Sequence, residues 1–180
     1  TIRGGDDFGR GSVRITNGAP VTAGGDVLII GGDDTAATST GNNIAIIQNA
    51  DVESTGGSVT ITAGDNAAVN SFLIQTNATV TAANDVTIAG GAGSGTDNVQ
   101  IGASTITAGG AATFSGESVV LNGGGLTAGT TVTVDQTGTG ALAVDAAMAG
   151  VLTGSGAADA LILRSATDID LQAAFHSTVA

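Results

Sequence analysis

The chain contains no cysteine, tryptophan or tyrosine, a single proline, and only 2% aromatic residues. Without cysteine it can form neither disulfides nor thiolate sites. Because aromatic side chains are so scarce, the 42% hydrophobic content must be packed as thin layers of Val, Ile, Leu and Ala instead of a bulky centre. This composition predicts regular, repetitive packing.

Positive charge is also scarce, since Lys and Arg total 4 against 16 Asp and Glu, a formal net charge of −12. Nucleic acid and anionic membrane surfaces are bound through basic patches, so we expect neither as a partner. No apolar run has the length of a membrane span, and no membrane insertion is predicted. The sequence has no signal-peptide pattern, and because it begins with Thr1 we expect a mature or excised piece.

One short phrase occurs five times in the sequence. It is a turn followed by a short alternating strand, and its copies span 22–29, 54–61, 81–88, 107–114 and 127–134. The copies start 32, 27, 26 and 20 residues apart. Repetition of one strand-forming unit is typical of stacked architectures, in which each repeat, called a rung below, packs only against its neighbours.

Each rung contains three apolar positions, two of them pairs that alternate with polar or small residues. This period of two predicts strands with one buried face. The first-position pairs are Val13/Ile15, Ile44/Ile46, Phe72/Ile74, Val99/Ile101 and Val119/Leu121. The second-position residues are Val21, Val52, Val80, Ile106 and Leu126. The third-position pairs are Val27/Ile29, Val59/Ile61, Val86/Ile88, Ala112/Phe114 and Val132/Val134.

Turn-forming residues separate these positions. Asn and Gly at 17–18, 77 and 122–124 follow the first position, and Gly pairs at 24–25, 56–57 and 109–110 precede the third. Both residue types tolerate positive φ, so we expect two tight corners per rung. The third connection, from one rung to the next, carries all the variation in length, which predicts that insertions lie on one side of the stack.

A single rung is too small to fold alone. Its roughly five buried aliphatic side chains contribute about 7 to 15 kcal/mol, whereas ordering about twenty residues costs about 1.5 kcal/mol each. The rungs must therefore stack through parallel strands. We predict an all-β parallel β-helix (β-solenoid) with three short strands per rung and about six to seven rungs. It forms one domain over 1–180, regular over about 13–134 and less regular over 135–180, as a segment of a longer coil or filament.

The pattern is weaker near both ends. Leu142/Val144 is predicted to begin one rung and Leu161/Leu163 another, with Ile169 and Phe175 in the second and third positions; a competing register makes Ile169/Leu171 a third-position pair. At the start, 2–7 resembles 30–34, so the chain is expected to open at the end of a rung. Neither terminus shows an amphipathic helix that would cap the stack, so we expect rungs to continue in a longer polypeptide or by end-to-end stacking of subunits.

Acidic residues in the Gly-rich connections are candidate calcium ligands. These are Asp6, Asp7, Asp33, Asp34, Asp65 and Asp97, and a parallel coil would gather them on one side. The segment 90–97 resembles the calcium-binding nonapeptide of repeats-in-toxin proteins, but its Asp comes two residues late and nothing repeats at nine. The alternative is that these are solvated turn residues and that the protein binds no cofactor.

Other polar residues give no sign of catalysis. Asp26, Asp85 and Asp168 precede strands and are interpreted as turn caps. His176 is the single histidine, so a zinc site or a Cys–His dyad is not available from this chain. There is no Gly-x-Ser-x-Gly motif and no phosphate-binding loop. We therefore expect a protein that is not an enzyme.

Threonines are predicted to form outward columns across rungs. One column holds Thr60, Thr87, Thr113 and Thr133, and Thr-x-Thr pairs at 79–81 and 105–107 form another. Flat Thr-x-Thr arrays resemble those of ice-binding β-solenoids. The same residues are also ordinary polar strand formers, and Pro20, Asp51, Glu53 and Gly125 would interrupt a continuous array.

The phrase Val-Thr-Ala-Gly-Gly-Asp-Val-x-Ile, clearest at 21–29 and altered at 80–88, 106–114 and 126–134, resembles the repeats of filamentous haemagglutinins and related large autotransporter adhesins. The similarity covers about 13–134 well and the remainder loosely. It implies a right-handed parallel β-helix, exported across the outer membrane of Gram-negative bacteria and displayed as a fibre used in adhesion, aggregation or biofilm. The family's secretion domain has no counterpart in this sequence.

The leading expectation is a structural segment of an extracellular bacterial surface fibre that holds length and presents loops. The first alternative is an adhesin segment that binds glycan or another cell surface through its variable loops. The remaining alternatives are an ice-binding solenoid and a polysaccharide-active β-helix enzyme. The enzyme is disfavoured because basic residues, aromatics for sugar stacking and clustered carboxylates are lacking.

Overall fold

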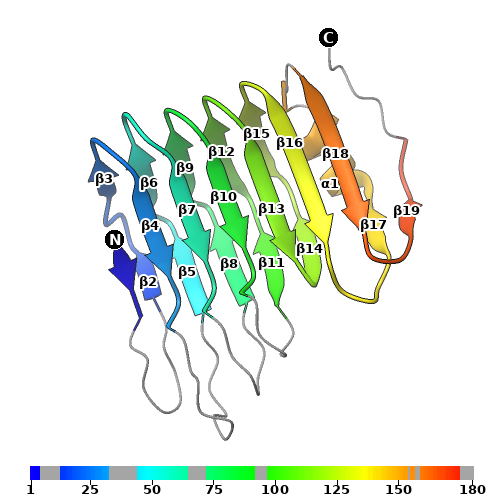
Figure 1. Ribbon diagram of the computed structural model, residues 1–180, viewed down its shortest axis with the longest axis horizontal. Coiled ribbons are helices and arrows are strands. Elements are labelled where there is room, and N and C mark those ends of the chain that lie inside the picture. Colours follow the sequence, from blue (N-terminus) through cyan, green and yellow to red (C-terminus); the bar gives the residue numbers. More distant parts are fainter. Residues whose placement is uncertain are drawn as a thin grey trace, which may run out of the picture.

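The computed structural model describes residues 1–4, 13–32, 44–64, 72–91, 97–153, 155–156 and 159–174, with the backbone alone for 44 and 72–75. These residues are mainly strands, gathered into long parallel sheets (Figure 1). The architecture is therefore all-β and parallel.

Three sheets contain most of the strands. Sheet A consists of β1 (Ile2–Arg3), β4 (Val27–Ile30), β7 (Val59–Thr62), β10 (Val86–Ala89), β13 (Ala112–Gly116), β16 (Thr131–Gln136) and β18 (Ala160–Ser165). Sheet B consists of β2 (Val13–Thr16), β5 (Ile44–Gln48), β8 (Phe72–Thr76), β11 (Asn98–Ile101) and β14 (Ser118–Leu121). Sheet C consists of β3 (Val21–Ala23), β6 (Asp51–Ser54), β9 (Thr79–Ala82), β12 (Ser104–Ala108) and β15 (Gly124–Ala128).

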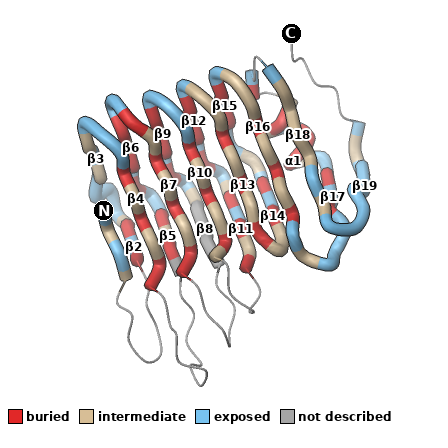
Figure 2. The backbone as a smooth tube through the Cα atoms, in the orientation of Figure 1, coloured by how far each residue is buried: buried red, intermediate tan, exposed pale blue. Residues whose placement is uncertain are grey.

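From β2 to β16, three consecutive strands visit sheets B, C and A in turn. Each strand pairs in parallel with its equivalent three strands later, so that Val27 lies beside Val59 and Val59 beside Val86. The predicted division of a rung into three strands is thus followed over this part of the chain. The buried residues of the three sheets belong to one hydrophobic core. Figure 2 shows that buried residues recur along the stacked strands.

The second and third apolar positions are confirmed. Every second-position residue lies beside its equivalent in the next rung, from Val21 to Leu126. The third-position pairs also lie beside their equivalents in the next rung, and the second residue of the pair is fully buried at Ile29, Ile61 and Ile88. Alternation predicted β7, β10 and β16 well because their threonines lie on one face, whereas β4 has four apolar residues and was placed by its position in the repeated phrase.

The first position was wrong in two rungs. In β5 the buried residues are Ala45 and Ile47, whereas Ile46 is only half-buried, because β5 pairs with β2 through Val13↔Ala45 and Ile15↔Ile47. In β8 the same backbone register aligns Leu73, not Phe72, with Ala45. Both sequences have apolar residues at consecutive positions, so alternation cannot choose between registers one residue apart; pairing with the neighbouring strands decides the register.

The first corner of the rung uses asparagine in the left-handed conformation. Asn17, Asn49 and Asn77 have φ of 60°, 51° and 46°. Adjacent corners are joined through the backbone, since the N–H of Gly18 donates to the carbonyl of Asn49 over 2.6 Å. Corners at Asn17 and Asn77 were predicted; the equivalent corner at Asn49 was missed.

The glycines of the second corner have a different role from the one predicted. None of Gly24, Gly25, Gly56, Gly57, Gly109 and Gly110 has positive φ. A Cβ placed on Gly56 would instead lie 2.6 Å from the carbonyl oxygen of Gly24 in the preceding rung. At Gly56, Gly57, Gly109 and Gly110 a Cβ would overlap the preceding corner, whereas on Gly24 and Gly25 it would meet nothing within 4 Å.

The C-terminal part departs from the predicted pattern. Residues of β17 (Leu142–Val144) are followed by a helix, α1 (Ala146–Thr153), where a strand of sheet C would otherwise stand. The helix buries Met148, Ala149 and Leu152 and packs against β14 and β15. This helix is not a terminal amphipathic cap, because β18 and β19 follow it and its Ala- and Gly-rich sequence has no polar face; the sequence analysis did not predict it.

Both registers predicted after Val134 were also wrong. Leu161 and Leu163 lie in β18 beside Val132 and Val134, so they occupy a third position. Ile169 and Leu171, in β19 (Ile169–Leu171), lie beside Leu142 and Val144 of β17, so they occupy a first position. The helix takes up the residues that would have formed a second position. At the other end, Ile2 lies beside Ile29, so β1 belongs to the end of a rung as predicted.

Candidate functional site

Only one of the six predicted calcium ligands lies among the described residues. Asp97 immediately precedes β11 and is buried, with 4% of its surface exposed. Its carbonyl oxygen accepts a 2.6 Å hydrogen bond from the N–H of Glu117 and lies close to the positions that Cβ atoms would take on Gly90 and Gly116. Asp6, Asp7, Asp33, Asp34 and Asp65 lie outside the described residues, as does His176.

Within the described ranges, no group of three or more His, Cys, Asp or Glu residues is arranged to hold a metal ion. The calcium site therefore remains a prediction about connections that the structure does not describe.

The interpretation of Asp26 and Asp85 as turn caps is supported by their hydrogen bonds. Oδ1 of Asp26 accepts from the N–H of Ser58, and Oδ1 of Asp85 accepts from that of Ala111, each over 2.8 Å. Between them, Oγ of Ser58 accepts from the N–H of Asp85. Each cap thus joins one rung to the next. Asp168 is exposed, and its carbonyl accepts from the N–H of Leu142.

The threonine columns are confirmed by the strand register. Thr60, Thr87, Thr113 and Thr133 lie beside one another across sheet A. On sheet C, Thr79 pairs with Thr105, but the same row continues to Asp51 on one side and Gly125 on the other. The predicted interruptions are therefore real, and the threonine array on sheet C is short.

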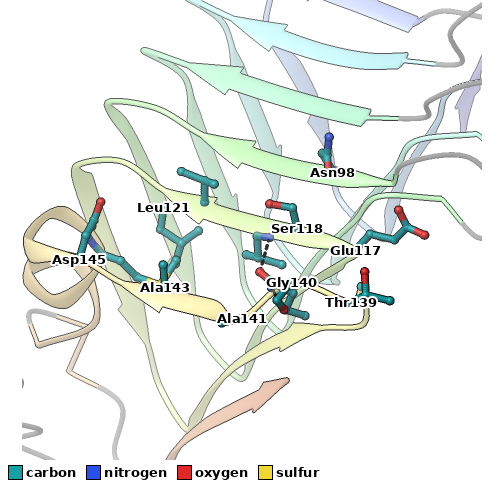
Figure 3. A pocket seen from close by; sticks show the side chains of 14 residues that line it. Asn98, Glu117, Ser118, Leu121, Thr139, Gly140, Ala141, Ala143 and Asp145 are labelled. Atoms are coloured by element: carbon teal, nitrogen blue, oxygen red, sulfur yellow. Dashed lines mark hydrogen bonds between the residues drawn. The ribbon is translucent and has the colours of Figure 1, made fainter. Parts of the chain in front are cut away.

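The candidate site with the clearest geometry is a crevice in the C-terminal part, named here the β14–β17 crevice. By position in the rung, β17 should pair with β14 and extend sheet B. Instead β14 ends sheet B and β17 pairs with β19 alone. A cavity of about 460 Å³ lies between the two strands, within the size range of ligand sites. Figure 3 shows it bordered by Ser118 and Leu121 on one side and by Ala141 and Ala143 on the other.

Two strand edges face each other across this crevice. Peptide groups alternate in direction along a strand, so on β14 those of Val119 and Leu121 point away from β11. On β17 the peptide groups of Leu142 and Val144 are bonded to the β19 side, which leaves those of Ala143 on the crevice side. The crevice is thus lined by backbone groups that an added strand could bond.

The side chain of Gln136 bridges the two sides of the crevice. This buried side chain accepts from the N–H of Val119 through Oε1 over 3.3 Å and donates through Nε2 to the carbonyl of Gly140 over 2.7 Å. It therefore takes one of the bonds that a paired strand would make. The sequence contained an indication of this feature. Gln136 is a polar residue at the next inward-facing position after Val132 and Val134.

The charge of the crevice is negative. Glu117 and Asp145 are among its lining residues, and no Lys or Arg is. Figure 3 places these two carboxylates toward opposite ends of the crevice. Oδ1 of Asp145 also accepts from the N–H of Met148 over 2.9 Å and so caps α1. In addition, Oδ1 of Asn98, another lining residue, is buried and has no hydrogen-bond partner among the described residues.

Comparison with protein-family models, with curated proteins and with solved structures found no match to this chain. In the ranges that the structure describes, no helix is long and apolar enough to cross a membrane.

Proposed function

We propose that the chain is a parallel β-helix, right-handed, with three strands per rung, and that it serves as a structural segment of an extracellular bacterial surface fibre. In this role it contributes to the length of the fibre and displays its variable connections. The resemblance of 21–29 and its copies to filamentous haemagglutinin repeats supports the family and the location.

The observation that carries this proposal is the register. Equivalent side chains lie beside one another through five successive rungs, for example from Val27 through Val59, Val86 and Ala112 to Val132. Each rung is thus a nearly interchangeable unit, and a stack of such units grows in length without new interactions. This suits a fibre better than a site built from one particular set of residues.

A second candidate function is adhesion through the variable connections. The strands of sheet A end at aligned residues, since Ile30 lies beside Thr62 and Thr62 beside Ala89. The connections that follow them therefore leave the described stack at one edge. Loops displayed along one edge could bind glycan or another cell surface repeatedly.

Electron microscopy of the native material tests the structural role. We expect filaments with a stacking repeat of about 4.8 Å along their length; discrete monomers would refute end-to-end assembly. The variant Thr22→Pro removes an N–H that points outward from β3, the open N-terminal edge of sheet C, so it should shorten filaments formed by stacking. Ala143→Pro makes the same change inside the crevice and is the matched control.

Adhesion and calcium binding have separate tests. A glycan array probed with the labelled chain should give specific binding if the second candidate is correct, and uniformly negative spots would count against it. A calcium titration followed by thermal melting tests Asp6, Asp7, Asp33, Asp34, Asp65 and Asp97 together; an unchanged melting temperature would exclude a structural ion.

A further inference from the structure

We propose that the β14–β17 crevice binds an extended, basic peptide segment of another protein, which inserts as a strand and completes sheet B. The inference rests on the geometry of the crevice and does not depend on the proposed fibre role.

The first argument is the break in the sheet. Sheet A continues without interruption from β16 to β18, which are paired over six residues. Sheet B stops at β14 although the next rung supplies a strand, β17, in the equivalent position. Sheet A therefore extends through this rung, whereas sheet B is interrupted after β14. This interruption leaves room for an added strand between β14 and β17.

The second argument is the set of bonding groups. An inserted strand needs donors and acceptors on both sides, at alternating residues. The crevice offers the peptide group of Leu121 from β14 and that of Ala143 from β17, and among the described residues neither β14 nor β17 pairs with another strand on that side. The buried, unbonded Oδ1 of Asn98 adds an acceptor in the lining.

The third argument fixes the chemistry of the occupant. The strand β14 has four residues, about 13 Å at 3.3 Å per residue, so the insert is short. Glu117 and Asp145 lie toward opposite ends, which favours a basic side chain at each end of the insert, four residues apart and therefore on one face. Buried Met148, Val119 and Leu121 favour small apolar residues on the other face.

A second copy of this chain fits poorly as the occupant. Its 180 residues include only four basic ones, Arg3, Arg10, Arg14 and Arg164, and its net charge of −12 opposes self-association at an acidic crevice. The chain has one pair of basic residues four apart, Arg10 and Arg14, and Val13 and Arg14 of this segment already belong to β2, which pairs with β5 in sheet B. The partner is therefore a different protein.

The test uses the full chain, labelled with ¹⁵N, and a blocked pentapeptide with lysine at its first and last positions, valine at the second and fourth, and threonine at the third. We expect the amide signals of Leu121 and Ala143 to shift and their hydrogen exchange to slow as peptide is added. A peptide with glutamate in place of lysine should bind at least about tenfold more weakly. So should a peptide N-methylated at its central residue, which has lost a donor.

Two kinds of variant test the site from the protein side. Ala143→Pro removes the N–H on the crevice side of β17 without touching the β19 ladder, and it should weaken binding about tenfold. Thr22→Pro makes the same change at an exposed edge of sheet C and should leave peptide affinity unchanged. Because proline could disturb β17, Glu117→Gln is the second variant. It should weaken binding about threefold at low salt and less at high salt.

Four results would overturn the inference. Binding without slower exchange at Leu121 and Ala143 would place the peptide elsewhere. Equal affinity for the lysine and glutamate peptides would refute the charge argument. No binding at millimolar peptide would refute the binding site. Protection of both amides that rises with protein concentration, without peptide, would assign the crevice to a second copy instead.

Discussion

The stacked glycine corners allow the same substitution, glycine to alanine, to be compared at two equivalent positions. Gly24 and Gly109 occupy the same place in the repeated phrase, and neither has positive φ. A Cβ on Gly24 would have no heavy atom within 4 Å, because no described rung precedes it. A Cβ on Gly109 would overlap the carbonyl oxygen of Ala83 and lie 2.9 Å from its carbon. The change to alanine is identical, but only at Gly109 would the added Cβ meet the corner of a preceding rung.

The magnitude follows from these contacts. At Gly109 the obstructing atoms are backbone, so the corner must shift, at a cost of about 1–3 kcal/mol. The shift would also weaken the 3.0 Å bond from the N–H of Gly109 to the carbonyl of Ala82, worth about 1 kcal/mol. Against this, alanine lowers the entropy of the unfolded chain and returns about 0.4–1 kcal/mol. We expect Gly109→Ala to destabilise by about 1–3 kcal/mol and Gly24→Ala to stabilise by about 0.5 kcal/mol.

Urea unfolding followed by circular dichroism measures both variants against the parent chain. Since stacked repeats can unfold in parts, hydrogen exchange at the Gly110 amide, which donates to the carbonyl of Asn84 over 2.8 Å, gives a local measure. Exchange there should accelerate in Gly109→Ala and not in Gly24→Ala. Equal stability of the two variants would refute the argument that glycine is required for close stacking.

Substitutions at other positions should change the stability by larger or smaller amounts. Phe114→Ala should cost about 3–5 kcal/mol because the ring is fully buried, whereas Val120→Ala, at a residue 41% exposed, should change the urea midpoint little. Asp85→Ala should cost about 1 kcal/mol by removing the acceptor for the Ala111 amide, and Asp85→Asn should restore most of it; equal loss in both would show that charge, not the bond, matters. Gln136→Leu should destabilise by about 1–3 kcal/mol, because it leaves the Val119 amide without its acceptor, and an unchanged melting temperature would contradict the role given to this side chain.

Prediction from sequence succeeded where polar residues mark one face of a strand. In β7 and β10, threonines alternate with Val and Ile, and the third position was correct in all five copies of the repeated phrase, from β4 to β16. It failed in β5, where Ile44, Ile46 and Ile47 offer apolar residues to both faces. It also failed at α1, whose Ala- and Gly-rich sequence has neither strand alternation nor a polar face that would reveal a helix.

The crevice was missed for a related reason. Each local feature was visible in the sequence, including Gln136 at an inward place and the loss of regularity after Val134. That β17 pairs with β19 and not with β14 depends on contacts between residues far apart in the chain. Local patterns do not report such pairing.

By itself the sequence determined the parallel strands, their three-fold order within a rung, the buried second and third positions and the outward threonine columns. Each of these follows from alternation and repetition, which are local and additive. The tertiary structure decided the register of β5 and β8, the close stacking of the glycine corners, the place of α1 and the opening between β14 and β17. These features depend on which strand pairs with which edge. Where a strand has apolar residues at consecutive positions, or where a rung is irregular, only the packing of neighbouring elements decides that pairing.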